Sequence, residues 1–223
     1  MKTTLIHKYA RMCACAMLTL LLTACHTTSK TAVDNRANHT GRWHDVYMPV
    51  KVSMSSPVSI SLSGRATIVN DSLINISMRV LGMEVAVMHC TADSVWLADK
   101  YHKYAFAESK QKVLGSPDMP LSELQNIMLG IDKDGRNSLT FNNPANGSEV
   151  RISFGDRTVT PAGNAAGQIR VDAPLDKGHV DAALTWNLRD ADWNTYRRVN
   201  FTPPGKGYRY FTAADVLGML KAM

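Results

Sequence analysis

The chain has 223 residues, of which 45% are hydrophobic and 20% charged, and its formal net charge is +6. A chain of this length and hydrophobic content can bury a sizeable core. Three of the basic residues lie within the first 11 positions, so the charge of the remainder gives little support for nucleic acid as a partner.

Residues 1–24 have the layout of a secretory signal peptide. Lys2, Lys8 and Arg11 precede an apolar stretch at residues 12–22, and small residues follow it. A membrane-spanning helix needs about 20 apolar residues, so this stretch is too short to be one. We therefore predict a signal peptide over residues 1–24, whose removal takes away half of the net charge.

The end of this segment, Leu22-Thr23-Ala24-Cys25, resembles the lipobox of bacterial lipoproteins. In that family the cysteine is lipidated on sulfur and the preceding peptide is removed, so the resemblance implies covalent diacylglycerol and an N-linked acyl chain such as palmitate on Cys25. The alternative is an ordinary signal peptide that meets a cysteine near its cleavage site. Each buried methylene of an acyl chain contributes about 0.8 kcal/mol to membrane anchoring.

Lipidation also changes the count of free cysteines. Cys13 and Cys15 leave with the signal and Cys25 carries lipid, so Cys90 remains alone and forms no internal disulfide. Residues 25–42 are polar and lack any period, which predicts a lipidated, flexible tether. Hydrophobic patterning begins at Trp43, and we assign residues 43–223 to a single domain.

Apolar and polar residues alternate with a period of two in many short segments of this domain, as β-strands require. The clearest are residues 57–69, where Val58, Ile60 and Leu62 share one face, and residues 73–80, where Ile74, Ile76 and Met78 do. Similar patterns occupy residues 83–89, 94–98, 149–154, 167–171, 179–188 and 195–201, with turn residues at positions 70–71, 81–82, 92–93, 99–100 and 177–178. Eight or more closely spaced strands predict one large curved antiparallel sheet, a barrel or a sandwich.

Two segments have helical patterning instead. Residues 120–130 begin with Pro120, carry Leu121, Leu124 and Met128 on one stripe, and stop at Gly130. The C-terminal residues 212–222 begin with Thr212 as N-cap and place apolar residues at helical spacing.

The turn at Leu81-Gly82-Met83 is unusual because its residues are apolar where Asn-Gly or Asp-Gly is the common choice. Such a turn is either tucked under another element or offered to a lipid or a partner.

Residues 100–112 also allow two interpretations, since they concentrate lysines around Tyr101 and Tyr104. They either touch anionic headgroups or form a solvated strand edge where lysines discourage edge pairing.

Catalytic and metal-binding motifs are missing from the sequence. The His89-Cys90 pair lacks the further ligands of a zinc site, so Cys90 is predicted to be a buried core thiol. His89, His102, His179 and Asp181 could be assembled into a hydrolase site only from distant positions, and their spacing does not favour one. We predict no enzyme, no metal and no free cofactor.

The order of lipobox, tether, "LSGRA", a strand pair joined by Leu81-Gly82, and "PLSELQNIMLG" resembles the outer-membrane lipoprotein receptor LolB and its carrier relative LolA. Residues 43–210, ending in "NFTPPGKGYRY", also resemble a family of uncharacterised bacterial lipoproteins of that presumed fold. The resemblance implies a mainly β (α+β) protein, an open and incomplete antiparallel β-barrel whose concave apolar face is covered by a few short helices.

The same resemblance implies a site and a function. The candidate exposed apolar loop is Leu81, Gly82 and Met83, and the candidate lining of the acyl cavity is Val58, Ile60, Leu62, Ile74, Ile76 and Met78. The expected function is that of an outer-membrane-anchored, periplasm-facing lipoprotein that binds a lipid or lipoprotein acyl chain without catalysis. The alternative is a structural or assembly lipoprotein of the envelope that uses its sheet as a protein-docking surface.

Overall fold

The computed structural model describes residues 43–56, 59–114, 119–131, 135–142, 149–175, 178–212 and 215. Two helices are described, α2 (Lys110–Leu114) and α3 (Leu121–Met128). The strands are β1 (Asp45–Ser56), β2 (Ile60–Val69), β3 (Leu73–Val80), β4 (Met83–Thr91), β5 (Ser94–Asp99), β6 (Tyr104–Ser109), β7 (Ser138–Asn142), β8 (Glu149–Phe154), β9 (Arg157–Thr160), β10 (Gly163–Ala166), β11 (Gln168–Leu175), β12 (Gly178–Trp186), β13 (Asp192–Trp193) and β14 (Arg209–Phe211). The signal peptide, the tether with Cys25, and Val58 lie outside these residues.

One 12-stranded sheet organises the fold, in the order β14-β6-β5-β4-β3-β2-β1-β12-β11-β8-β7. The order begins and ends on different strands, so the sheet is open, as the family resemblance implied. β13 pairs with the start of β1, and β9 and β10 form a separate two-stranded sheet. Neighbouring strands are antiparallel with one exception, since β14 runs parallel to β6. β14 is parallel because a long connection returns the chain to β6 in the same direction.

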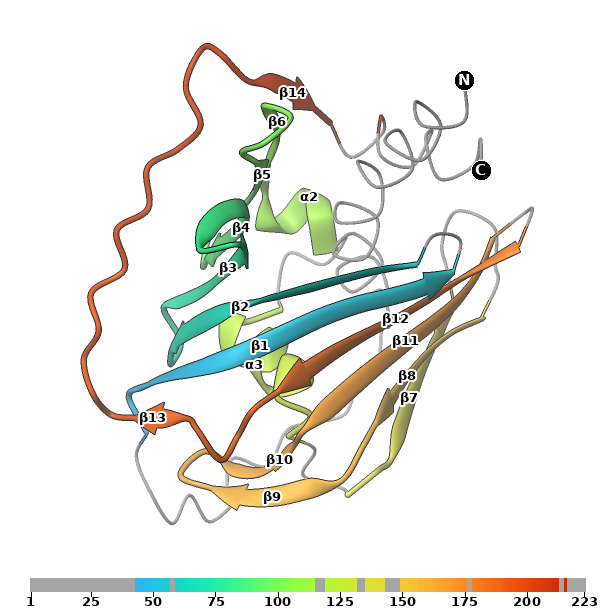
Figure 1. The fold of residues 1–223 in the computed structure, drawn as a ribbon. Coiled ribbons are helices and arrows are strands. Elements are labelled where there is room, and N and C mark those ends of the chain that lie inside the picture. Colours follow the sequence, from blue (N-terminus) through green and yellow to red (C-terminus); the bar gives the residue numbers. More distant parts are fainter. Residues whose placement is uncertain are drawn as a thin grey trace.

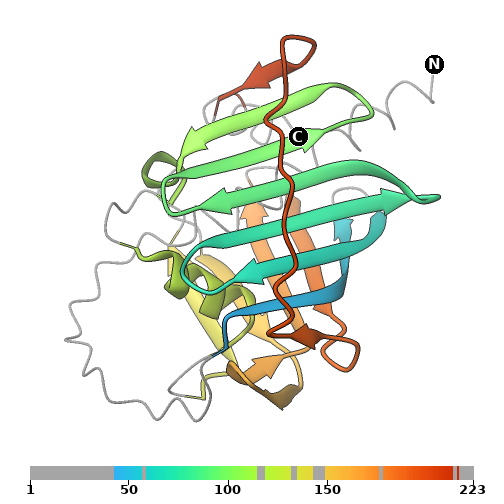
Figure 2. The same ribbon diagram turned by 90° about the vertical axis from the view of Figure 1, so that its left-hand side faces the viewer.

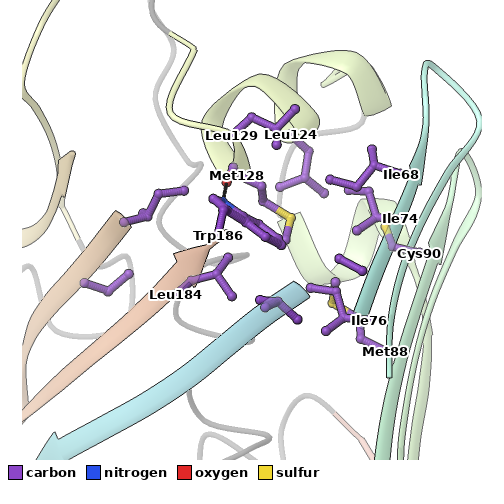
Figure 3. Packing of buried hydrophobic residues seen from close by; sticks show 14 of the residues in the cluster. Ile68, Ile74, Ile76, Met88, Cys90, Leu124, Met128, Leu129, Leu184 and Trp186 are labelled. Atoms are coloured by element: carbon purple, nitrogen blue, oxygen red, sulfur yellow. Dashed lines mark hydrogen bonds between the residues drawn. The ribbon is translucent and has the colours of Figure 1, made fainter. Parts of the chain in front are cut away.

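The sheet folds into two arms that face one another, with β1 at the bend (Figure 1). β2 to β6 form one arm, and β12, β11, β8 and β7 form the other. Figure 3 shows Ile68, Ile74 and Met88 from the first arm pointing toward Leu184 and Trp186 of β12, with Leu124 and Met128 of α3 between them. All of these residues belong to one buried hydrophobic cluster.

Trp186 connects the second arm to helix α3. Its side chain is buried, and its indole Nε1–H donates to the Met128 carbonyl oxygen at 2.6 Å (Figure 3). That carbonyl is one of the C-terminal groups that a helix leaves without an internal partner. The tryptophan therefore fills the core and satisfies the end of the helix at once.

Helix α3 confirms the pattern of residues 120–130. Leu121, Leu124 and Met128 are buried, while Pro120, predicted as the first helical residue, is the N-cap, so the helix begins one residue later at Leu121. The helix ends at Met128 with Leu129 as its C-cap, and Gly130 follows with a φ of 61° while the Ile131 N–H donates to the Asn126 carbonyl in a Schellman motif.

Gln125 is a buried polar residue that the apolar stripe did not reveal. Its side chain is fully buried, and the amide donates to the carbonyls of Val69 at 2.8 Å and Leu73 at 3.2 Å. Its oxygen accepts from the Asp71 backbone N–H at 3.0 Å. Gln125 thus satisfies the β2–β3 turn and fixes α3 against the first arm.

The strand predicted over residues 195–201 is wrong. Residues 194–208 form an extended strap that crosses the outer face of β2 to β6, opposite the helices (Figures 1 and 2). Asn194 and Tyr196 have φ values of 58° and 52°, which break the extended run where the strap leaves β13. The apolar Phe201 of this segment packs on the sheet from outside and is not part of a strand. Its ring stacks on that of His89, with 4.0 Å between the centroids.

The stack on His89 predicts a pH-dependent stability. Burial lowers the pKa of His89 below its ordinary value of 6.5, so the unfolded chain binds more protons than the folded one as the pH falls below 6.5. The contribution of His89 to the free energy of unfolding should be complete above pH 6.5 and should decline as the pH falls below it. Urea unfolding of the wild type and His89→Phe at several pH values measures this contribution. An identical pH dependence in the two proteins would show that His89 makes none.

The chain end is described only in part. The Asp215 N–H donates to the Thr212 Oγ1 at 3.2 Å, and the Thr212 N–H donates to the Asp215 carboxylate at 2.8 Å. These two reciprocal bonds have the pattern of a capping box, in which Thr212 is the predicted N-cap. The rest of the helix predicted over residues 212–222 lies outside the described residues. In the part of the chain that the structure covers, no helix is long and apolar enough to cross a membrane.

Candidate functional site

An apolar row runs along β3 from the core to the tip of the β3–β4 hairpin. Ile74, Ile76, Met78 and Val80 alternate along the strand and so share its inward face. Their exposed fractions rise in order, from 0% at Ile74 through 5% and 6% to 42% at Val80. The row ends at Leu81, which is 94% exposed.

Val58 lies outside the described residues, and the other five predicted cavity residues all lie in or against this inward face. Ile74, Ile76 and Met78 are buried in the core cluster, whereas Ile60 and Leu62 are half-buried and pack against it. Met54 and Val52 of β1 pair with Ile60 and Leu62, which extends the apolar surface across the bend. The predicted lining residues therefore gather on one face of neighbouring strands.

The turn at Leu81-Gly82 projects into solvent. Leu81 has a φ of 50° and Gly82 a φ of 83°, the pair of positive values that a two-residue hairpin turn of type I′ needs. A positive φ is uncommon outside glycine, asparagine and aspartate, and such strain costs about 1–3 kcal/mol. Leu81 is thus unfavourable here both in its backbone and in its exposed side chain, and Met83 beside it is 67% exposed.

A polar cluster holds the base of this hairpin in place. Glu84 pairs with Lys100 at 2.5 Å and accepts a hydrogen bond from the Ser77 hydroxyl. Burial tends to raise the pKa of Glu84, but the hydrogen bonds from Lys100 and Ser77 outweigh it and lower the pKa below its ordinary value. The charged pair ties the hairpin to the β5–β6 turn, so the apolar tip stands on a fixed base.

The β5–β6 turn lies at the same end of the sheet, because β3 and β5 both flank β4 in antiparallel pairs. It carries Lys100, Tyr101 and Lys103, and Tyr101 is 76% exposed. The alternative that these lysines protect a strand edge is wrong, since they lie in a turn and the strand that follows, β6, pairs with β5 and β14. Basic and aromatic side chains thus stand next to the apolar tip.

The other candidates from the sequence lie outside the apolar row and its tip. Cys90 is buried as predicted, and burial raises the pKa of its thiol to about 12, so it is not a nucleophile at neutral pH. His102 binds the Asp99 carboxylate at 2.6 Å in the β5–β6 turn. Among the described residues, no three His, Cys, Asp or Glu side chains lie close enough to hold a metal ion.

Asp181 is engaged in an ion pair on the second arm. Its carboxylate accepts two hydrogen bonds from Arg170, at 2.7 and 2.6 Å, and one from the Ser55 hydroxyl at 2.6 Å. These bonds, with Arg170 the larger contributor, hold the pKa of Asp181 below its ordinary value. The structure leaves His89 on β4 and His179 and Asp181 on β12, so it does not bring the proposed hydrolase residues into one site.

Val80 is a site residue that the sequence analysis did not name. It could have been found, because it continues the alternation of Ile74, Ile76 and Met78 along the same strand. It joins the buried row of β3 to the exposed turn. The fold and the site together define an open, strongly curved β-sheet with an apolar inner face that continues to an exposed hairpin tip.

Comparisons with known proteins find likeness in structure. No protein-family model and no curated protein matches the chain. A DUF1329 family protein from Desulfovibrio piger is similar at 10% identity and a TM-score of 0.45, over 70% of this chain and 88% of that one. A domain described as an outer membrane lipoprotein-sorting protein domain, from Vibrio parahaemolyticus, is similar at 10% identity and a TM-score of 0.44, again over 70% and 88% of the two chains.

A LolA superfamily protein from Nitrosomonas europaea is similar at 7% identity and a TM-score of 0.38, over 83% of this chain and 94% of that one. These are the kinds of protein that the sequence resemblance named. At such identities and TM-scores the likeness carries no argument about function, which has to come from the site itself.

Proposed function

We propose that this protein is an outer-membrane-anchored, periplasm-facing lipoprotein that binds the acyl chain of a lipid or lipoprotein and catalyses no reaction. Cys25 would carry the lipid anchor, and the domain from Trp43 onward would bind the ligand. The observation that supports this proposal is the continuous apolar row from Ile74 to Leu81, with its rising exposure.

Acyl chains are recognised through apolar contact, since they offer no polar group along their length. The row on β3 gives such a chain an unbroken apolar path from the exposed tip to the inward face of the sheet. The strain at Leu81 favours a functional role, because asparagine or glycine would form the same turn at lower cost. Lys100, Tyr101 and Lys103 of the β5–β6 turn suit the headgroup region beside an inserted tip.

Leu62 offers a direct test because it is half-buried at the outer part of the inward face. Leu62→Glu places a charge where the acyl chain would lie, and we expect it to weaken uptake of a fluorescent fatty acid at least about tenfold, equivalent to about 1.4 kcal/mol. A fluorescence titration of the purified protein measures the affinity.

Ser61→Glu is the matched control. Ser61 is the preceding residue of the same strand and points to the opposite, exposed face. It should leave affinity unchanged. Equal weakening by both substitutions would mean that charge on β2, rather than the inward face, affects binding.

The alternative function as a structural or assembly lipoprotein predicts a different result in cells. Crosslinking would then recover one protein partner in stoichiometric yield. Acyl-chain binding predicts instead that many acylated proteins or lipids are captured in small amounts.

A further inference from the structure

A second site lies at the opposite end of the sheet from the apolar tip. The β2–β3 turn stands at this end, because β3 runs from that turn to the tip. A pocket of about 190 Å³ opens here beside the start of β1. Its walls include Trp43, His44, Asp45, Asn70, Tyr196 and Arg197.

Asp45 is a buried carboxylate in this pocket without a cationic partner. Its residue is 3% exposed, and its two carboxylate oxygens accept from the Tyr196 backbone N–H at 3.2 and 3.1 Å. No Lys, Arg or His among the described residues forms an ion pair with it. The nearby Arg197 is engaged elsewhere, since it binds Asp192 at 2.7 Å and lies over the Tyr47 ring at 4.1 Å. Buried carboxylates are rarely left without a counter-charge.

Tyr196 presents an aromatic ring beside this carboxylate at the cost of backbone strain. Its φ is 52°, an outlier for a bulky residue, yet its side chain is 82% exposed. Two contacts hold the strained segment: the Asp45 carboxylate accepts from Tyr196, and the Asp45 carbonyl accepts from the Asn194 N–H at 2.8 Å. Strain of this kind persists where the surrounding structure enforces it, and it is frequent at ligand sites.

Two further aromatic rings complete the wall. The His44 ring lies 6.2 Å from that of Tyr196 with 31° between the planes. Trp43 is buried and meets Trp193 edge to face at 5.8 Å. The side-chain amide of Asn70 and the imidazole of His44 have no hydrogen-bond partner within the described residues. The pocket therefore combines aromatic rings, unused polar groups and one uncompensated negative charge.

We propose that this pocket binds an organic ammonium group. A cation of this kind would supply the missing counter-charge to Asp45 and lie within the about 6 Å of ring centroids at which the faces of Trp and Tyr attract cations. An anion would meet the charge of Asp45, and a neutral polyol would leave that charge uncompensated. Ammonium groups occur both on free amines and on lipid headgroups, and the site recognises the chemistry that the two share.

The test is a titration of the full chain, purified in an uncharged polyoxyethylene detergent, with choline. Backbone amide shifts of residues 43–45, 70 and 196 should change and saturate, with a Kd of about the millimolar range. 3,3-Dimethylbutanol, which has the shape of choline without its charge, should bind at least about tenfold more weakly. Glycerophosphocholine separates the two sources: binding tighter than that of choline assigns a lipid headgroup, and weaker binding assigns a free amine.

Two variants locate the binding. Asp45→Asn keeps an oxygen that accepts from Tyr196 but removes the charge, and Tyr196→Asn removes the ring while tolerating the positive φ. Each should weaken choline binding at least about tenfold. Asp172→Asn, the same chemical change at an exposed carboxylate on β11, should have no effect. The proposal is overturned if the shifts do not saturate by about a hundred millimolar choline, or if the neutral analogue binds equally well. It is also overturned if glucose binds in place of choline, or if Asp45→Asn binds choline as the wild type does.

Discussion

Replacing both Leu81 and Met83 with aspartate should reduce binding to phospholipid vesicles at least about a hundredfold. Burying a leucine or methionine side chain in an apolar phase contributes about 1.5–3 kcal/mol, and the substitution removes two such side chains and adds two charges. Vesicle flotation of a form that begins at residue 26 measures this effect without the contribution of a lipid anchor.

Val159→Asp provides the matched control. Val159 is an apolar residue of β9 that is 83% exposed, so the change adds one negative charge and removes exposed apolar area at a different place. Vesicle binding should persist in this variant. Equal loss in both proteins would show that vesicles sense the net charge and not the hairpin tip.

A single substitution, Leu81→Asn, separates function from folding at the same position. Asparagine tolerates the positive φ of this turn, so the hairpin should become more stable by about 1 kcal/mol while vesicle binding weakens. Thermal unfolding and flotation of the same preparation measure the two effects. Greater stability with unchanged vesicle binding would contradict a role for the Leu81 side chain.

Trp186→Ala should destabilise the protein by about 3–5 kcal/mol, because truncation of a buried tryptophan leaves a cavity between the two arms of the sheet. It also removes the hydrogen bond to the Met128 carbonyl at the end of α3. Denaturant unfolding measures the loss.

Trp186→Phe separates the loss of packing from the loss of the hydrogen bond to the Met128 carbonyl. Phenylalanine keeps much of the packing and loses the indole N–H, so its cost should be about 1–3 kcal/mol, the penalty of an unsatisfied buried carbonyl. A cost below about 1 kcal/mol for Trp186→Ala would mean that the two arms do not share one core.

The strands of the first arm were predictable because one of their faces is buried and the other is polar. This gives β2, β3 and β4 a clear period of two. The hairpin turns were predictable for the same reason, since each interrupts the alternation. The exposure of Leu81 was not predictable, because an apolar turn has the same sequence pattern whether or not a neighbouring element covers it.

β1 shows why the centre of the sheet was harder to recognise. It is the longest strand but contains Pro49, which argues against a central strand because proline cannot donate to a ladder. The structure places Pro49 between Tyr47, the last residue paired with β13, and Val50, the first paired with β12. The missing N–H therefore falls at a break in the pairing, which only the tertiary arrangement reveals.

The strap and the ammonium pocket were hidden from the sequence for a related reason. The alternation of residues 195–201 is real, but Tyr196 takes a positive φ and the segment crosses the strands instead of pairing with them. Asp45 and Tyr196 are 151 positions apart, and no spacing rule connects them. Gln125 is similar, because its partners at the β2–β3 turn lie more than 50 positions away.

Photolabelling with a fatty acid that carries a diazirine near the end of its chain tests the central proposal most directly. The purified protein is irradiated with the probe, and mass spectrometry locates the labelled residues. Acyl-chain binding on the inward face predicts saturable labelling within residues 60–88 that unlabelled fatty acid displaces. Labelling that does not saturate, or that falls on the outer face of the sheet beneath the strap, would contradict it.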